Sequence, residues 1–265
     1  MLSSAVYLLA GLTATPLKKK ARISEIKRKD WFLILVTSIT GAVIAPLLFF
    51  SGLAQSKASD TSVLSNAEII FTVLLAIVFF REKLKPIGYL SIALVIVGVI
   101  IITNNLEFSA SILNMKSEGD FLILAAMVFW GLDNNISKIA SQRIDDAARL
   151  IQLRSTIGGS CLFAIVLLFG IPINITLAEI PKIVLLGVAG FGISYFFFLN
   201  SLKRIGTVRT MVIYSTSAIF GLFLASIFLH ESIGMYQVVA ITMMLAGIFL
   251  IERKDKYIDI KQINH

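Results

Sequence analysis

Three ionisable side chains lie inside long apolar stretches of this 265-residue chain: Glu68, Asp133 and Arg154. A charge near the centre of a bilayer costs about 3 kcal/mol even on lenient insertion scales, so each such residue is a functional hypothesis by default. Carboxylate and guanidinium groups at that depth can exchange protons, form ion pairs or bind charged solutes.

Glu68 is the deepest of the three. It lies nine residues after Ser59, where an apolar stretch begins, which places it roughly 13 Å from the outer edge of a membrane. No basic residue is predicted at this depth, so we expect a protonated carboxyl group that releases its proton when the pathway opens or a cationic solute arrives. The alternative is a neutral glutamic acid bonded to a neighbouring helix. Asn66, two residues earlier, is a further candidate.

Asp133 and Arg154 belong to consecutive apolar stretches of opposite direction. Counting residues puts Asp133 about 20 Å below the outer edge and Arg154 about 10 Å above the inner one, so the two are predicted to pair. Either this pair joins two helices, or it forms a substrate-responsive gate or an anion site. Asn134 and Asn135 extend the polar patch, and we expect at least one of them to face a cavity, because two adjacent amides cannot both point into lipid without cost.

A second group of polar residues lies in the C-terminal half. Tyr195 and Tyr214 are each predicted about 10 Å from the inner face, so they can meet across a cavity, and Thr216 adds a hydroxyl group nearby. The alternative for each tyrosine is a packed ring with its hydroxyl group on a backbone carbonyl.

Other kinds of site are excluded by composition and motif. One Cys rules out a disulfide framework and cysteine-based metal sites, and two His leave little for a histidine site. The sequence has no phosphate-binding loop, no dinucleotide-binding glycine turn and no HExxH motif. No cofactor, metal or enzymatic activity is predicted.

The composition indicates a membrane protein. The chain is 57% hydrophobic and only 15% charged, with a mean hydropathy of +0.88. A soluble domain carries more charge than this, and a disordered chain has fewer aromatic residues, so both classes are excluded.

The sequence predicts an all-α integral membrane protein, because each apolar stretch is long enough to cross about 30 Å of hydrocarbon as a helix. Nine spans are predicted: Met1–Leu17, Trp31–Leu53, Ser59–Phe80, Leu84–Asn104, Gly119–Ala140, Ala147–Gly170, Pro181–Leu202, Thr207–Leu229 and Gly234–Glu252.

The basic residues predict the orientation of these spans. Of 24 Lys and Arg residues, 20 fall in alternate loops and the C-terminal tail, and only 3 in the opposite loops. The positive-inside rule then places the C-terminus, with the tail 253–265, in the cytoplasm. The net charge of +8 reflects topology, so nucleic acid is not expected as a partner.

An internal repeat relates the two halves. A shift of 149 residues overlays Trp31–Ile102 on Ile180–Ile251 without a gap, with 16 identities in 72 positions that include Gly41 with Gly190. The predicted repeats are residues 1–105, with four spans, and residues 119–252, with five. The first helix of the first repeat is therefore expected to be missing. Repeats of five spans lie in opposite orientations, as in many secondary transporters.

The segments FWGLDNNISK at 129–138, AEIIFTVLLAIVFFREKLKPIGYLSIALVIVGVIII at 67–102 and GTVRTMVIYSTSAIFGLFLASIFLHESI at 206–233 resemble the EamA family of the drug/metabolite transporter superfamily. Glu82 and Glu231 match the glutamate that ends the fourth and ninth helices in that family, and Gly98 and Gly247 match a late glycine in the following helix. This resemblance implies a ten-helix carrier fold, here without its first helix, that moves a small organic solute across the cell membrane.

The resemblance and the residues together leave several alternatives open. A lipid-linked substrate flippase, a truncated fragment without transport by itself and a membrane-embedded enzyme are the competing interpretations. The expected partners are membrane lipids, a small-molecule solute and either protons or a counter-solute, and a homodimer is left open. Substrate charge and the direction of transport are also left open, because Glu68 favours a cation and Arg154 an anion.

Overall fold

The computed structural model describes residues 1–17, 26–56, 61, 64–65, 67–79, 85–104, 118–144, 146–172, 175–214, 216–229, 234–236, 238–243, 245–247 and 250. Every regular element in these residues is a helix, which confirms the expected all-α class for the described part of the chain. Asn66, Glu82, Glu231 and the C-terminal tail lie outside the described residues.

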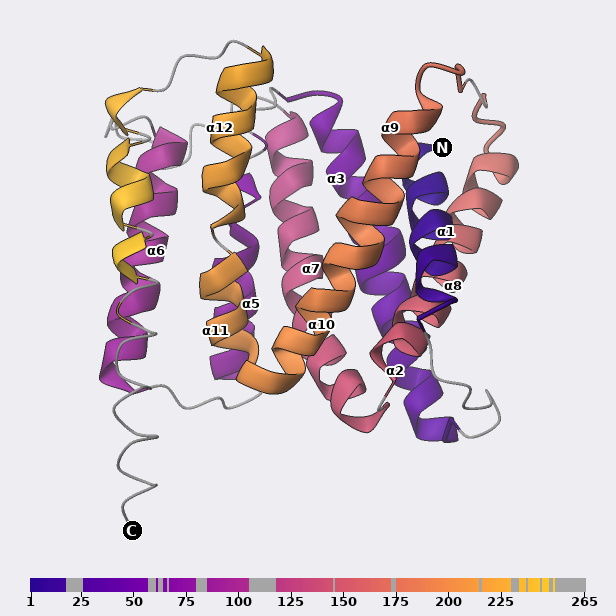
Figure 1. Cartoon of the computed structure of the whole chain (residues 1–265), viewed down its shortest axis with the longest axis horizontal. Helices are drawn as coiled ribbons and strands as arrows, with labels where there is room; N and C mark the ends of the chain where they lie inside the picture. Colours follow the sequence, from indigo (N-terminus) through magenta and orange to yellow (C-terminus); the bar gives the residue numbers. More distant parts are fainter. Residues whose placement is uncertain are drawn as a thin grey trace. The chain divides into compact units, whose positions relative to one another are not determined.

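The helices follow the apolar stretches of the sequence (Figure 1). In chain order they are α1 (Leu2–Ala14), α2 (Arg28–Ile39), the π-helix η2 (Thr40–Ile44), α3 (Ala45–Leu53), α5 (Ala67–Val78), α6 (Pro86–Asn104), α7 (Glu118–Arg143), α8 (Ala147–Leu168), α9 (Ile180–Leu185), the π-helix η3 (Leu186–Ile193), α10 (Ser194–Ile205), α11 (Thr207–Tyr214) and α12 (Ser217–Leu229).

Three continuous helical runs in the described residues are long and apolar enough to cross a membrane: Arg28–Leu53, Ala147–Leu168 and Ile180–Ile205. The other predicted spans coincide with helices that are shorter, less apolar or only partly described, so the number of spans stays a prediction. The start of α8 and the end of α10 each have a local cause. The Asp146 side chain accepts a hydrogen bond from the Arg149 amide at 3.1 Å and caps α8, and Gly206, with φ of 84°, ends α10.

The chain divides into two compact units. Unit 1 consists of Met1–Phe50 and Leu132–Thr207, and unit 2 consists of Ser51–Gly131 and Val208–His265. Each unit therefore combines segments from both predicted repeats.

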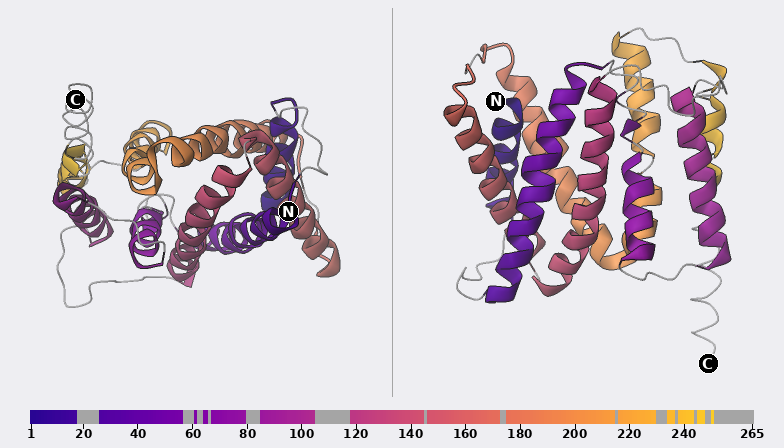
Figure 2. Two further views of the ribbon diagram at one scale, coloured as in Figure 1. Left: turned by 90° about the horizontal axis from the view of Figure 1, so that it is seen from below. Right: turned by 180° about the vertical axis from the view of Figure 1, so that it is seen from behind.

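Unit 1 is built around the contact between α1 and α8 (Figures 1 and 2). Helix α1 also packs against η3, and α8 packs against η2. Glycines permit these approaches: a Cβ atom at Gly158 of α8 would collide with Ala42 of η2, and one at Gly187 of η3 would lie 2.7 Å from the Leu9 Cβ of α1. Small residues that let helix backbones approach closely are the usual solution in lipid, where no hydrophobic force drives helix association.

The two π-helical segments occupy corresponding places in the predicted repeat. Adding 149 to the bounds of η2 gives residues 189–193, which fall within η3. In the first copy, Pro46 lies two residues after the last residue of η2 and lacks the amide that an α-helix needs, which accounts for a disturbed hydrogen-bond pattern just before it. The sequence predicts a bend at Pro46, and the structure has a π-helix that ends at Ile44, just before the α-helix that contains Pro46.

Unit 2 contains α5 beside α6, with the buried residues Ile101 and Ala240 in one apolar cluster (Figure 2). The Ser91 hydroxyl of α6 donates a hydrogen bond to the Gly247 carbonyl at 2.7 Å.

The predicted continuous helix over Thr207–Leu229 is wrong at one point. Helix α11 ends at Tyr214, Thr216 is a turn residue, and α12 begins at Ser217. The Thr216 hydroxyl donates to the Ile213 carbonyl at 2.8 Å, which is the kind of local side-chain bond that competes with helix geometry. Ser65, 149 residues before Tyr214, is likewise a turn residue directly ahead of α5 and donates to the Thr61 carbonyl at 2.7 Å.

Candidate functional site: a buried ion pair in unit 1

The C-terminal half of α7 brings a polar patch into the interior of unit 1. Asp133, Asn134 and Asn135 are all buried, and Ser137 lies one helical turn beyond Asp133. Both adjacent amides are buried, and the expectation that at least one of them faces a cavity stays a prediction.

Arg154 of α8 pairs with Asp133. Its Nη2 atom lies 2.6 Å from Asp133 Oδ2, and the side chains are only 4% and 1% exposed. The prediction that these residues sit at one level and pair is therefore confirmed. Because desolvation of two charges is costly, such a pair persists only when further hydrogen bonds satisfy both groups.

Arg154 makes two further contacts that supply this support. Its Nε atom donates to the Thr37 carbonyl of α2 at 3.2 Å. Its guanidinium carbon lies 4.3 Å from the centre of the Tyr195 ring of α10, within the range of a cation–π interaction.

The hydroxyl groups of Ser137 and Tyr195 complete the surroundings of Asp133. Ser137 donates to Asp133 Oδ1 at 3.3 Å, Tyr195 donates to Oδ2 at 3.4 Å, and the two hydroxyl oxygens lie 3.1 Å apart. Tyr195 therefore bonds to side chains, rather than to a backbone carbonyl as the alternative prediction had it. We refer to Asp133, Ser137, Arg154 and Tyr195 as the ion-pair cluster.

The remaining predicted site residues belong to unit 2. Glu68 is buried in the first turn of α5, Tyr214 is 41% exposed at the end of α11, and Thr216 lies in the turn that follows. The meeting of Tyr195 with Tyr214 across a cavity stays a prediction, as do the roles of Asn66 and Glu68.

Sequence reasoning missed Ser137, Gly41 and the Thr37 carbonyl. Ser137 could have been found, because residues four apart share a helix face and Asp133 had already been selected. The Thr37 carbonyl could not, since a backbone contact from another helix has no residue-type signal. Gly41 was matched with Gly190 as a repeat position only, and a Cβ atom there would collide with both charged side chains of the ion pair.

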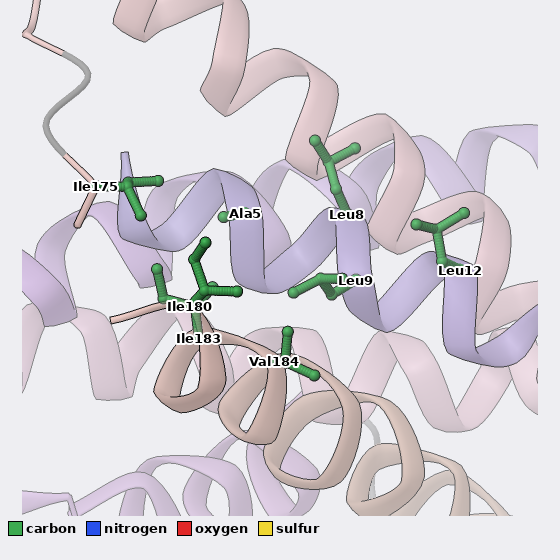
Figure 3. A pocket seen from close by; sticks show the side chains of 8 residues that line it. All are labelled: Ala5, Leu8, Leu9, Leu12, Ile175, Ile180, Ile183 and Val184. Atoms are coloured by element: carbon green, nitrogen blue, oxygen red, sulfur yellow. The ribbon is translucent and has the colours of Figure 1, made fainter. Parts of the chain in front are cut away.

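Unit 1 also contains an apolar cavity of about 340 Å³ between α1 and α9 (Figure 3). Its lining is entirely aliphatic: Ala5, Leu8, Leu9, Leu12, Ile175, Ile180, Ile183 and Val184. With no polar group to orient a ligand, it offers contact but no specificity. In the part of the chain that the structure describes, no three His, Cys, Asp or Glu side chains gather to hold a metal ion.

The sequence profile of the EamA-like transporter family matches residues 1–104 and 117–253. The chain belongs to the EamA-like transporter family. This confirms the family resemblance seen in the sequence, and it places the chain in a family of integral membrane transporters.

Two relatives of this EamA-like chain extend the likeness. One from Methanothermobacter thermautotrophicus, described as an uncharacterized transporter, is 31% identical and aligns over 92% of this chain and 75% of its own length. Another uncharacterized transporter, from Clostridium kluyveri, is 25% identical over 91% of this chain and 79% of its own. A crystal structure with 14% sequence identity has a TM-score of 0.72 over 94% of this chain and 85% of that chain, which shows a shared fold.

Proposed function

We propose that this EamA-family chain is a secondary transporter that moves a small organic solute across the cell membrane by alternating access between two inverted repeats. The observation that carries the proposal is the ion-pair cluster: two opposite charges, buried among apolar helices of a transporter family, held by a carbonyl, two hydroxyl groups and an aromatic ring. Ionisable groups inside membrane helices mark substrate and ion pathways.

The repeat is supported within unit 1. Helices α2 and α9 begin 152 residues apart, close to the repeat spacing of 149, and Figure 1 shows them starting at opposite ends of this unit. Helix α1 packs on η3 while α8 packs on η2, so each of two helices that the 149-residue shift overlays contacts the π segment of the other copy. Reciprocal contacts of this kind are what an inverted repeat generates.

In this scheme the ion-pair cluster has a defined task. The pair is closed and buried in the present state, so a passing solute must separate Arg154 from Asp133 or pass only once the cluster opens. Glu68, Asn66, Asn134, Tyr214 and Thr216 are proposed as further residues of the pathway. Glu68 is the proposed proton-coupling group.

The distribution of basic residues supports a cytoplasmic C-terminus.

Flux measurement in liposomes tests this function. The purified chain would be reconstituted, and counterflow of a panel of small anionic, cationic and zwitterionic organic solutes would be followed. We expect saturable flux for at least one solute class. We also expect Asp133→Asn and Arg154→Gln to lower the rate roughly tenfold or more, since misplacing a positioned group by about 1 Å can cost a hundredfold.

Arg143→Gln is the matched control, because Arg143 is half exposed and its nearest Asp30 oxygen is 3.9 Å away. An ion pair at this distance that involves a half-exposed arginine contributes little, so this variant should keep its rate within about twofold. The absence of saturable flux for every solute class would contradict the proposed function. Wild-type rates in both Asp133→Asn and Arg154→Gln would show that the ion-pair cluster has no role in transport.

A further inference from the structure

The π-helix η2 meets the ion pair with its glycine. Gly41 lies so close to the pair that a Cβ atom at this position would collide with Arg154 Nη2 and with the Asp133 carboxyl group. The same stretch of backbone, one turn earlier, supplies the Thr37 carbonyl to Arg154. The pair can close as it does only because position 41 has no side chain.

Gly41 is in turn held by α1. The Tyr7 hydroxyl donates a hydrogen bond to the Gly41 carbonyl at 2.8 Å, and Tyr7 is only 4% exposed. Its ring lies 5.2 Å from that of Phe191 in η3 and packs with Ala42 and Leu162 in one apolar cluster. A buried hydroxyl group bonded to a buried carbonyl fixes both partners, because either one left unpaired is costly.

The second copy of the repeat has the same glycine but no charge beside it. Gly190 corresponds to Gly41, and among the residues that the structure describes a Cβ atom there would meet only the flexible Leu186 side chain, at 3.2 Å. Arg154 corresponds to Ala5, which lines the apolar cavity in Figure 3. Gly190 is therefore a control for Gly41, because both glycines lie in equivalent π-helices but only Gly41 contacts an ion pair.

We propose that Gly41 and Tyr7 are positioning residues for the Asp133–Arg154 pair. Gly41 provides the space in which the pair closes, and Tyr7 fixes that part of the backbone from α1. A shift of α1 relative to η2 is thereby transmitted to the pair. Neither residue is required to contact solute. The proposal rests on the proposed function for its transport readout, but its geometric part can be tested without transport.

The transport test compares Gly41→Ala, Gly190→Ala and Tyr7→Phe in liposomes, with the solute that gives the highest wild-type flux. We expect Gly41→Ala to lower the maximal rate roughly tenfold or more and to leave KM within about twofold, because the pair is displaced while solute contacts remain. Tyr7→Phe should lower the maximal rate about threefold to tenfold, because it removes one buried hydrogen bond. Gly190→Ala should stay within about twofold. Equal rates for Gly41→Ala and Gly190→Ala, or a silent Tyr7→Phe, would overturn the proposal.

A stability cycle keeps the proposal testable if Gly41→Ala folds poorly or if no solute is transported. The drop in unfolding midpoint caused by Gly41→Ala would be measured in the wild-type chain and in an Asp133→Ala/Arg154→Ala background, where the colliding atoms are gone. We expect the drop to be at least halved in that background, since contacting residues are not additive. An equal drop in both backgrounds overturns the positioning role. If no solute is transported but the drop in unfolding midpoint is halved in the double-alanine background, the proposed function is contradicted. The positioning role of Gly41 is then still supported.

Discussion

At the scale of single residues, the structure separates what holds the ion-pair cluster together from what it does. Asp133 is satisfied by Arg154, Ser137 and Tyr195, and Arg154 also bonds the Thr37 carbonyl. This degree of satisfaction suits a structural pair joining α7 to α8. The family context and the position of the pair inside apolar helices favour a second role in transport. The two roles can be separated, because stability and flux respond differently to removal of the whole pair.

The first prediction therefore concerns stability. Removing one partner, as in Asp133→Leu or Arg154→Met, should cost about 3 to 5 kcal/mol because it leaves a buried charge uncompensated. Replacing both should cost far less, because a buried pair can often be exchanged for apolar residues of similar volume. Thermal or denaturant unfolding in detergent would measure this.

The same double variant decides the role of the pair. If it is stable but has lost flux, the pair acts in transport. If it is stable and transports like the wild-type chain, the pair is only a structural link between α7 and α8. Arg143→Gln removes a half-exposed cation that lies 3.9 Å from an Asp30 oxygen, and it should change stability by less than about 1 kcal/mol.

The second prediction concerns Glu68. Glutamine cannot exchange a proton, so Glu68→Gln should remove the dependence of flux on a pH gradient while leaving the chain folded. Asp120→Asn is a suitable control, because Asp120 is a second buried carboxyl group of unit 2 whose Oδ1 accepts from Ser56 at 2.5 Å. Proton-driven flux of wild-type size in Glu68→Gln would exclude proton coupling through this residue.

At the scale of secondary-structure elements, close helix contacts at glycines position the cluster. The contact of α8 with η2 depends on Gly158, where a Cβ atom would meet the Ala42 side chain and lie 2.9 Å from its carbonyl oxygen. Because Thr37 and Gly41 lie on this same α2–η2 run, the contact also fixes the backbone that Arg154 uses.

The third prediction follows from that contact. Gly158→Leu should destabilise the chain by about 2 kcal/mol, the usual cost of overpacking, since the backbones must separate. Cys161→Leu also enlarges a side chain of the same helix, but at an exposed position, and should be near neutral. Comparable unfolding midpoints for the two variants would mean that α8 and η2 do not pack as described.

The fourth prediction concerns the turn before α9. The Thr176 amide donates to the Glu179 carboxylate at 2.8 Å, and this hydrogen bond holds the pKa of Glu179 below its ordinary value. A carboxyl group whose pKa is lowered by folding stabilises the folded turn above its ordinary pKa. That contribution is lost as the pH falls through the lowered value. Hydrogen exchange at the Thr176 amide should therefore show less protection in acid than at neutral pH. Glu179→Gln should abolish that pH difference, and an unchanged difference would contradict it.

At the scale of the whole molecule, the sequence predicted the class of fold and one part of the site well. Hydropathy located the helices because each must satisfy its own backbone in lipid, and residue counting brought Asp133 and Arg154 to one level because the helix rise is constant. The π segments and the break before α12 were not predicted. The break before α12 depends on a hydroxyl–carbonyl hydrogen bond, which hydropathy does not register, and hydropathy likewise does not distinguish a π-helix from an α-helix. The contacts of Gly41 and Tyr7 could not be predicted either, because they join segments whose packing the sequence does not specify.

The central claim is that two copies of one helical bundle cross the membrane in opposite directions. Arg28 and Leu177 test it most directly, because both are exposed and lie 149 residues apart, Arg28 at the start of α2 and Leu177 just before α9. Single Arg28→Cys and Leu177→Cys variants, made in a Cys161→Ser chain that has no other cysteine, would be treated with a membrane-impermeant maleimide in intact cells and in inside-out vesicles. We expect Leu177→Cys to react in intact cells and Arg28→Cys only in inside-out vesicles. Labelling of both positions from the same side would contradict the inverted repeat and the alternating-access proposal that depends on it.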